Sequence, residues 1–218
     1  MTETSLAGRR DSFAPVGARP PTPAGLSARL REATREAHLA AEAAFALDAR
    51  LENSDAYVRL LAALHGFHRP VEAALAAVPG WSGLTPGLHI SSRLRAGLLD
   101  EDLRQLGVPA PPGPARPGVV SLPTLAHGLG CLYVLEGSAL GGRIIARRAC
   151  AALGADLPVA FFSSAGRADP GAGWRAFQSS LDAYGTCHGL ATRRTVTTSA
   201  LTTFQALANR LPPAGPCR

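Results

Sequence analysis

Four side chains near the start of the chain have the types and the spacing of a ligand-binding stripe. On a helix with 3.6 residues per turn, Arg31, Arg35, His38 and Glu42 fall together on one flank. The two guanidinium groups lie roughly 4.5 and 10.5 Å along the axis from the imidazole. Glu42 can hydrogen-bond one ring nitrogen of His38 and fix its tautomer. This pattern fits a flat ligand that needs an axial nitrogen at its centre and cations at its edge, as haem does with its iron and two propionates.

The same stripe has a plain structural interpretation. Arginine and glutamate at three- and four-residue spacing are typical of the exposed edge of an amphipathic helix, and one half-buried histidine can belong to such an edge. The spacing alone therefore leaves open a haem site or an ordinary helix surface.

A second informative segment is a long helical pattern that contains three glycines, Gly137, Gly141 and Gly142. Each glycine costs up to about 1 kcal/mol relative to alanine inside a helix, so the set costs on the order of 2–3 kcal/mol. Gly137 and Gly141 are four residues apart and share a face, which predicts a kinked helix where backbone lies against a flat ligand or another helix.

Glycines in this pattern are also compatible with a helix end at Gly141-Gly142, with close helix packing, or with a phosphate-binding loop. The phosphate loop is excluded, because no strand precedes the segment and no Gly-Lys-Ser/Thr sequence ends it. Ligand contact and helix packing remain open on this pattern.

Helical periodicity runs through most of the chain and predicts the elements that position these residues. The pattern indicates an all-α, single-domain bundle of about six to eight helices, with strand signals nearly absent. We expect a disordered leader over residues 1–25, one domain over 26–211 and a disordered tail over 212–218, with a long proline-rich loop at 108–119. The expected helices cover residues 27–47, 54–78, 91–106, 123–153, 173–184 and 192–211.

Composition narrows the class of protein. Hydrophobic residues make up 46% of the 218 residues, and no uninterrupted apolar run is long enough to span a bilayer. The first residues contain no apolar run behind Arg9-Arg10, so we expect no export signal. The net charge is +6, but the 22 basic residues are all arginine and are scattered, so we expect no nucleic-acid partner and no membrane partner. The four cysteines are far apart, which indicates free thiols and a cytoplasmic location.

The two segments together resemble the haem oxygenases. Residues 30–42, LREATREAHLAAE, are similar to the proximal helix of that family, and residues 132–148, LYVLEGSALGGRIIARR, are similar to its distal helix. The match is to the bacterial biliverdin-producing type that often accompanies bacteriophytochromes. The motifs have the family's order, and the resemblance extends from about residue 27 to residue 211.

The resemblance implies roles for residues on both sides of haem b. His38 matches the axial ligand of the iron, and Glu42 matches the acidic residue that orients it. The basic residues at the haem edge are Arg31, Arg35 and, in the pair Trp174-Arg175, Arg175.

On the distal side, Gly137, Gly141 and Gly142 match the glycines whose backbone crowds the haem. Many members have an aspartate one residue after the first of these glycines, where it orders water for proton delivery. This chain has Ser138 there, and the bacterial type commonly lacks the aspartate. Catalytic roles are therefore expected for Ser138 and the three glycines, with a water network in place of the carboxylate.

The implied activity is oxidative cleavage of haem, with O2 and external electrons, to biliverdin, CO and ferrous iron. A ferredoxin or a reductase would supply the electrons, since no nicotinamide or flavin motif is present, and a bacteriophytochrome is a candidate recipient of biliverdin. A monomer is favoured. One alternative is a helical haem carrier or sensor without catalysis. A second is a helical di-iron oxygenase, for which Glu42, Glu72 and Glu136 are the best ligand candidates although no Glu-x-x-His occurs.

Overall fold

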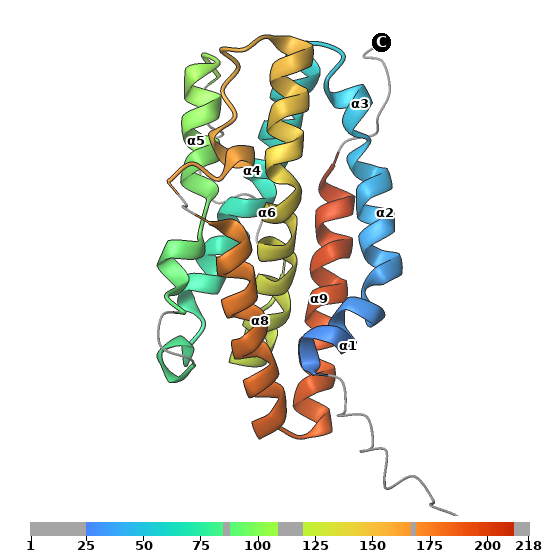
Figure 1. Cartoon of the computed structure of the whole chain (residues 1–218), viewed down its shortest axis with the longest axis vertical. Helices are drawn as coiled ribbons and strands as arrows, with labels where there is room; N and C mark the ends of the chain where they lie inside the picture. The colour runs from blue at the N-terminus through green and yellow to red at the C-terminus, as the bar shows by residue number, and fades with distance from the viewer. Residues whose placement is uncertain (1–24, 85–87, 109–119, 167–168, 212–218) are drawn as a thin grey trace, which may run out of the picture.

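The structure is a computed structural model of an all-α bundle, which confirms the predicted fold class (Figure 1). It describes residues 25–84, 88–108, 120–166 and 169–211, so the predicted leader before residue 25, the tail and most of the proline-rich loop lie outside the described residues. In order the helices are α1 (Leu26–Ala33), α2 (Arg35–Phe45), α3 (Leu47–Arg50), α4 (Ser54–Ala77), η1 (Trp81–Gly83), η2 (Ile90–Arg93), α5 (Ala96–Gln105), α6 (Leu125–Leu153), α7 (Ala160–Ser163), α8 (Pro170–Cys187) and α9 (Leu190–Arg210).

The longest helix, α6, runs through the middle of the bundle, as Figure 1 shows. Its residues from Leu129 to Glu136 are all buried, and at Gly130 its backbone lies directly against the Val196 carbonyl of α9. By length and composition α6 could cross a membrane, but 61% of its apolar window is buried inside the bundle. Packing in the core therefore accounts for its apolar character.

The helix predicted over residues 27–47 is wrong as a single element. It is divided at Thr34, whose hydroxyl donates to the Leu30 carbonyl at 2.8 Å, and again at Ala46, which has a left-handed φ of 43°. A threonine hydroxyl bonded to the carbonyl four residues back often bends a helix. Thr34 thus separates α1 from α2.

Two further segments differ from the helices that the periodicity predicts. The helix predicted over 91–106 begins with η2 and restarts as α5, and the buried Glu72 carboxylate accepts the backbone N–H groups of Arg95 and Ala96 at 2.8 Å each. The segment around residue 160, which lies outside the expected helices, forms the short helix α7. The Asp102 carboxylate accepts the N–H groups of Ala160 and Phe161, which satisfies two donors of its first turn.

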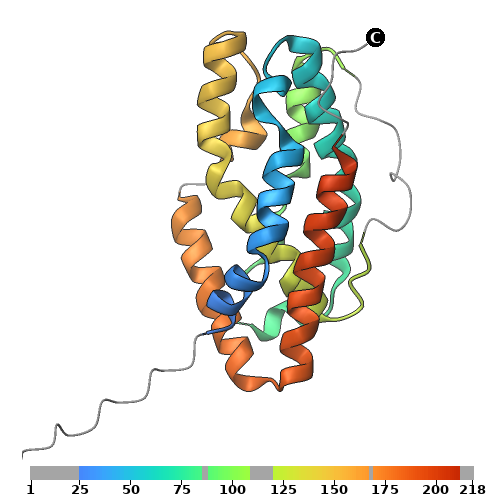
Figure 2. The same ribbon diagram turned by 90° about the vertical axis from the view of Figure 1, so that its right-hand side faces the viewer.

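The core has two parts. One joins α1, α4, α8 and α9 to the N-terminal half of α6, and the other joins α4, α5 and α7 to its C-terminal half. Figure 2 shows α6 bending part-way along its length, where the two parts meet. The glycines of the predicted distal segment lie in this middle stretch.

Candidate functional site

Helices α2 and α6 run in the same direction (Figure 1), and side-chain contacts link the residues that flank α2 to α6 at both ends. At one end the side chains of Thr34 and Tyr133 share a hydrogen bond, and at the other Asp48 of α3 pairs with Arg148 of α6. The two pairs have almost the same offset in residue number, 99 and 100. Because both helices rise about 1.5 Å per residue, residues with this offset lie at the same level.

This register brings the two sequence motifs opposite each other. His38 stands at the level of Gly137, and Glu42 stands at the level of Gly141. The His38 side chain is 53% exposed, and a Cβ added to Gly141 would meet no atom within 4 Å. At these two positions α2 and α6 are therefore not packed against each other, and open space lies next to Gly141.

Exposed apolar side chains flank that space. Leu39 of α2 is 55% exposed, and Leu140 and Ile144 of α6 are 41% and 56% exposed. Exposed leucine and isoleucine gathered near one opening are typical of an apolar binding surface. An exposed imidazole at the level of an apolar, glycine-containing helix supplies the nitrogen donor and the side-chain-free surface that a flat apolar ligand with a central metal requires, so the residues present fit haem.

His38 is held on α2 by two neighbours. Its Nδ1 lies 3.7 Å from Glu42 Oε2, and its ring meets the ring of Phe204 on α9 edge-on, with 5.7 Å between centroids. Since Nδ1 faces Glu42, Nε2 is the nitrogen on the other side of the ring and is left for a ligand.

The three glycines of the distal motif have different surroundings. A Cβ on Gly137 would lie 3.8 Å from the Trp174 ring, whereas one on Gly142 would overlap the carbonyl oxygen of Phe162 on α7. Gly142 therefore permits close packing of α6 on α7, and of the three only Gly141 faces open space. The helix continues through all three, which excludes a helix end at Gly141-Gly142.

The predicted edge arginines come from three helices. Arg31 lies in the last turn of α1 and Arg35 begins α2, and both are exposed. The break at Thr34 means that Arg31 does not continue one regular helix with His38, whereas Arg35 does. Arg175 is exposed near the start of α8 and lies 3.6 Å from the Asp169 carboxylate. Its neighbour Trp174 packs on Tyr133 with 5.3 Å between ring centroids, which places the start of α8 beside the distal stretch of α6.

Ser138 is exposed on α6 but has buried polar groups behind it. Its hydroxyl donates to the Leu135 carbonyl at 2.8 Å and accepts from the guanidinium of Arg95 at 3.3 Å. The neighbouring buried Arg93 pairs with Glu136 at 2.9 Å. Sequence reasoning missed both arginines, because their partners lie about forty positions away in the chain.

The carboxylates proposed for a di-iron site have separate partners. Glu42 lies beside His38 at the surface, Glu72 binds His68 Nδ1 at 2.9 Å and the start of α5, and Glu136 pairs with Arg93. Burial lowers the pKa of His68, and the charges of Arg95 and His65 act in the same direction, against the hydrogen bond to Glu72. Within the described ranges, no group of three or more His, Cys, Asp or Glu side chains could hold a metal ion.

Three more histidines have local partners. His65 Nε2 lies 2.7 Å from Asp100, and His188 stacks on Tyr184 with 3.8 Å between ring centroids. His127 Nδ1 lies 2.7 Å from the Thr124 hydroxyl.

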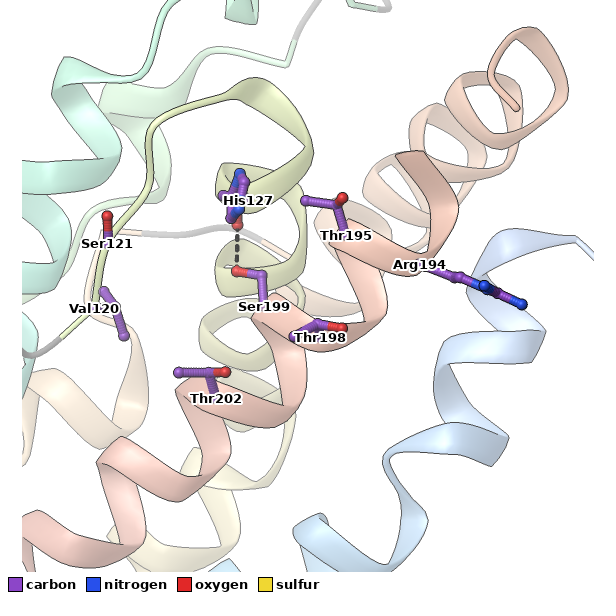
Figure 3. A pocket seen from close by; sticks show the side chains of 8 residues that line it. All are labelled: Val120, Ser121, His127, Arg194, Thr195, Thr198, Ser199 and Thr202. Atoms are coloured by element: carbon purple, nitrogen blue, oxygen red, sulfur yellow. Dashed lines mark hydrogen bonds between the residues drawn. The ribbon is translucent and has the colours of Figure 1, made fainter. Parts of the chain in front are cut away.

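A pocket of about 390 Å³ lies between the lead-in to α6 and the outer face of α9 (Figure 3). At about 100° per residue, its α9 residues are on the opposite side of that helix from Phe204, which contacts His38. The pocket is therefore distinct from the space between α2 and α6. Its lining residues are Val120, Ser121, His127, Arg194, Thr195, Thr198, Ser199 and Thr202.

Comparison with solved structures shows the same fold. The NO- and CO-bound haem oxygenase from Neisseria meningitidis aligns with a TM-score of 0.69 over 86% of this chain and 90% of that chain, at 19% identity. The haem oxygenase from Leptospira interrogans aligns with a TM-score of 0.67 over 86% of this chain and 98% of that chain, also at 19% identity.

Comparison of sequences gives closer relatives. No protein-family model matches the chain. Haem oxygenase from Xanthomonas campestris pv. campestris (strain 8004) is 35% identical over 133 residues, which are 60% of this chain and 74% of that protein. Haem oxygenase PigA from Pseudomonas aeruginosa is 33% identical over 160 residues, which are 72% of this chain and 77% of that protein. With this identity over most of both relatives, and with the fold they share, the chain belongs to the haem oxygenase family.

Proposed function

We propose that this protein cleaves haem to biliverdin, CO and ferrous iron, and that it holds haem between α2 and α6. The observation that carries the site is the register of the two helices, which sets the half-exposed His38 at the level of Gly137, about one turn before the open face of Gly141. When bound, haem supplies the iron at which O2 is activated with external electrons, and it is also the substrate.

In this proposal His38 would bind the haem iron through Nε2. Glu42 next to Nδ1 keeps the other nitrogen unprotonated and raises its basicity. The edge of Phe204 limits rotation of the ring, because the two side chains touch at nearly right angles. No sulfur ligand competes at this position, since the described cysteines lie elsewhere, on α6 and at the end of α8.

The distal side is formed by backbone and a hydroxyl. Gly141, without a side chain, lets haem approach α6 closely. Gly137 likewise adds no side chain to the neighbouring surface of α6 beside Trp174. Gly142 supports this surface by packing on α7. Ser138 offers the polar group at the face of α6.

The ligand's two carboxylates require cations at the open edge. Arg31, Arg35 and Arg175 are the candidates, and arginine suits carboxylates because its planar fork donates two parallel hydrogen bonds. Arg175 would exchange its exposed pairing with Asp169 for a propionate. Exposed ion pairs of this kind contribute little to stability, so the exchange has a small cost.

Electrons come from an external acidic protein, a ferredoxin or a reductase, that docks at this arginine-rich edge. The protein acts as a monomer in the cytoplasm, a location supported by the free thiols of Cys131, Cys150 and Cys187. A bacteriophytochrome that takes up biliverdin is a fitting recipient of the product.

The test is a haem titration followed by turnover with ascorbate or ferredoxin, in the wild type and in His38→Ala. We expect the wild type to bind haem with one axial histidine and to convert it to a biliverdin spectrum, and His38→Ala to lose the ligation and nearly all product. His127→Ala is the matched control, because His127 lies in the pocket on the far side of α9. Loss in His127→Ala with an unchanged His38→Ala spectrum would reject the site, and haem binding without oxidation would indicate a carrier.

A further inference from the structure

Arg95 reaches the distal face of α6 from inside the protein. It lies directly before α5 and is 4% exposed, and its Nη2 donates to the Leu135 carbonyl at 3.1 Å and to Ser138 Oγ at 3.3 Å. One guanidinium nitrogen therefore donates to two groups three residues apart, Leu135 at the end of the buried part of α6 and Ser138 just after it. Ser138 itself is exposed and stands three residues before Gly141, on the same side of the helix.

The position of Arg95 is fixed by groups that do not belong to α6. Its backbone N–H donates to the buried Glu72 carboxylate at 2.8 Å, and its guanidinium stacks over the Phe161 ring at 4.7 Å. His68 lies between the same two groups, 2.9 Å from Glu72 and in ring contact with Phe161. Arginine does not release its proton in proteins, so Arg95 acts as a permanent donor and cannot relay protons.

The contacts of Ser138 determine which hydrogen bonds it can still make. A hydroxyl has one hydrogen and two lone pairs. The hydrogen is directed to the Leu135 carbonyl, and one lone pair receives the Arg95 N–H. The remaining lone pair can only accept a hydrogen bond.

We infer that Arg95 is a positioning residue that holds Ser138 as a fixed hydrogen-bond acceptor at the haem-facing side of α6. This inference rests on the proposed haem site between α2 and α6. A water molecule that donates one hydrogen to Ser138 keeps its second hydrogen for a ligand on the distal side of haem. Without Arg95, the Ser138 hydroxyl could rotate and donate, and the water would lose its fixed orientation.

Fluoride and carbon monoxide separate this role from simple packing. Fluoride bound to ferric haem accepts hydrogen bonds strongly, whereas carbon monoxide bound to ferrous haem accepts them weakly. We expect Ser138→Ala and Arg95→Lys each to weaken fluoride binding about three- to tenfold, the effect of one ordinary hydrogen bond. Carbon monoxide affinity should stay within about twofold.

Arg95→Lys keeps the charge and the aliphatic stem but lacks the planar fork, so it tests geometry and lowers the risk of unfolding. The matched control is Arg93→Lys, a neighbouring buried arginine that pairs with Glu136 and not with Ser138. It should leave the ratio of fluoride to carbon monoxide affinity unchanged. Ser138→Thr retains a hydroxyl and should bind fluoride as the wild type does.

The double variant Ser138→Ala/Arg95→Lys completes the cycle. If Arg95 acts through Ser138, the double variant should bind fluoride no more weakly than Ser138→Ala alone. Additive losses, an unchanged fluoride affinity in either single variant, or an equal fall in fluoride and carbon monoxide affinity would each overturn the inference. Failure of the wild type to bind haem through His38 would instead reject the proposed function, and this inference with it.

Discussion

Gly142 of α6 lies against the carbonyl oxygen of Phe162, so closely that the glycine position has no room for a Cβ atom. The adjacent Gly141 faces open space. Two neighbouring positions in one helix are thus glycine for different structural reasons. One permits helix packing, and the other leaves a surface free for a ligand.

This difference predicts opposite effects of two alanine substitutions on the protein without haem. Gly141→Ala should raise the free energy of unfolding by about 0.5–1 kcal/mol, because alanine favours the helix and meets no neighbour. Gly142→Ala should lower it by about 1–3 kcal/mol, because the methyl group must displace α7. Thermal or chemical denaturation measures both, and equal effects would contradict the assignment.

A larger side chain at the open position tests the ligand surface itself. Gly141→Leu should leave the haem-free protein folded, yet reduce haem binding and turnover to near zero by filling the space opposite α2. The comparison is between the melting temperature without haem and the affinity for haem. Normal haem affinity in a folded Gly141→Leu protein would place the ligand elsewhere.

Glu42→Gln should have a milder effect than His38→Ala. The amide can still hydrogen-bond Nδ1 but lacks the charge that increases the basicity of the imidazole, so haem affinity should fall by about tenfold or less while histidine ligation persists. Glu36→Gln is the control, because Glu36 is an exposed acid on the same helix away from His38. Equal losses in the two variants would show that net charge, and not contact with His38, is responsible.

Docking of an acidic electron donor should depend on salt. Arg31, Arg35 and Arg143 are all exposed, and Arg31 and Arg35 carry no ion pair with a described residue at 4.0 Å or less. Ferredoxin-driven turnover should therefore fall steeply between roughly 0.05 and 0.5 M NaCl as the charges are screened. Turnover with ascorbate, which needs no docking, should change little. The same salt sensitivity with both reductants would mean that salt acts on haem binding or folding.

The buried His68 should make stability depend on pH. Burial lowers the pKa of His68 in the folded protein, while the unfolded chain has the ordinary value of about 6.5. Below that value the unfolded chain takes up a proton that the folded protein does not, so the free energy of unfolding should fall by up to about 1.4 kcal/mol per pH unit. Above it the contribution of His68 is fully present.

Denaturation at about pH 7.5 and pH 5.5 measures this effect. His68→Gln should reduce the difference in free energy of unfolding between the two conditions, even if it destabilises the protein at both. His89→Gln, at an exposed position, should keep the wild-type difference. A full pH effect in His68→Gln would assign it to other groups.

The fold class and most helix positions could be predicted because they depend on local periodicity. Helix α6 follows its apolar pattern through three glycines, and its predicted end at Leu153 is confirmed. The break at Thr34 was missed, because the residues on both sides keep helical spacing and only the hydroxyl bond to Leu30 marks the bend.

Of the candidate site, only the side formed by α2 could be predicted from the sequence in detail. His38 and Glu42 form a pattern within a single helix, so spacing reveals them. Arg95 has no local signal, since its contacts with Glu72 and Ser138 join three segments that meet only in the folded chain. Gly141 and Gly142 look alike in the sequence, and only the position of α7 separates their roles.

The two connections between α2 and α6 differ in strength, and this has a consequence for how a ligand leaves. Thr34 and Tyr133 meet where both residues are buried, with 2% and 8% exposure. Asp48 and Arg148 pair in solvent, with side chains 89% and 49% exposed, and such a pair contributes at most about 1 kcal/mol. We therefore expect α2 and α3 to move together about the buried Thr34 contact when the exposed ion pair between Asp48 of α3 and Arg148 breaks. The exit would widen from the carboxyl-terminal end of α2, and His38, nearer the Thr34 contact, would move least.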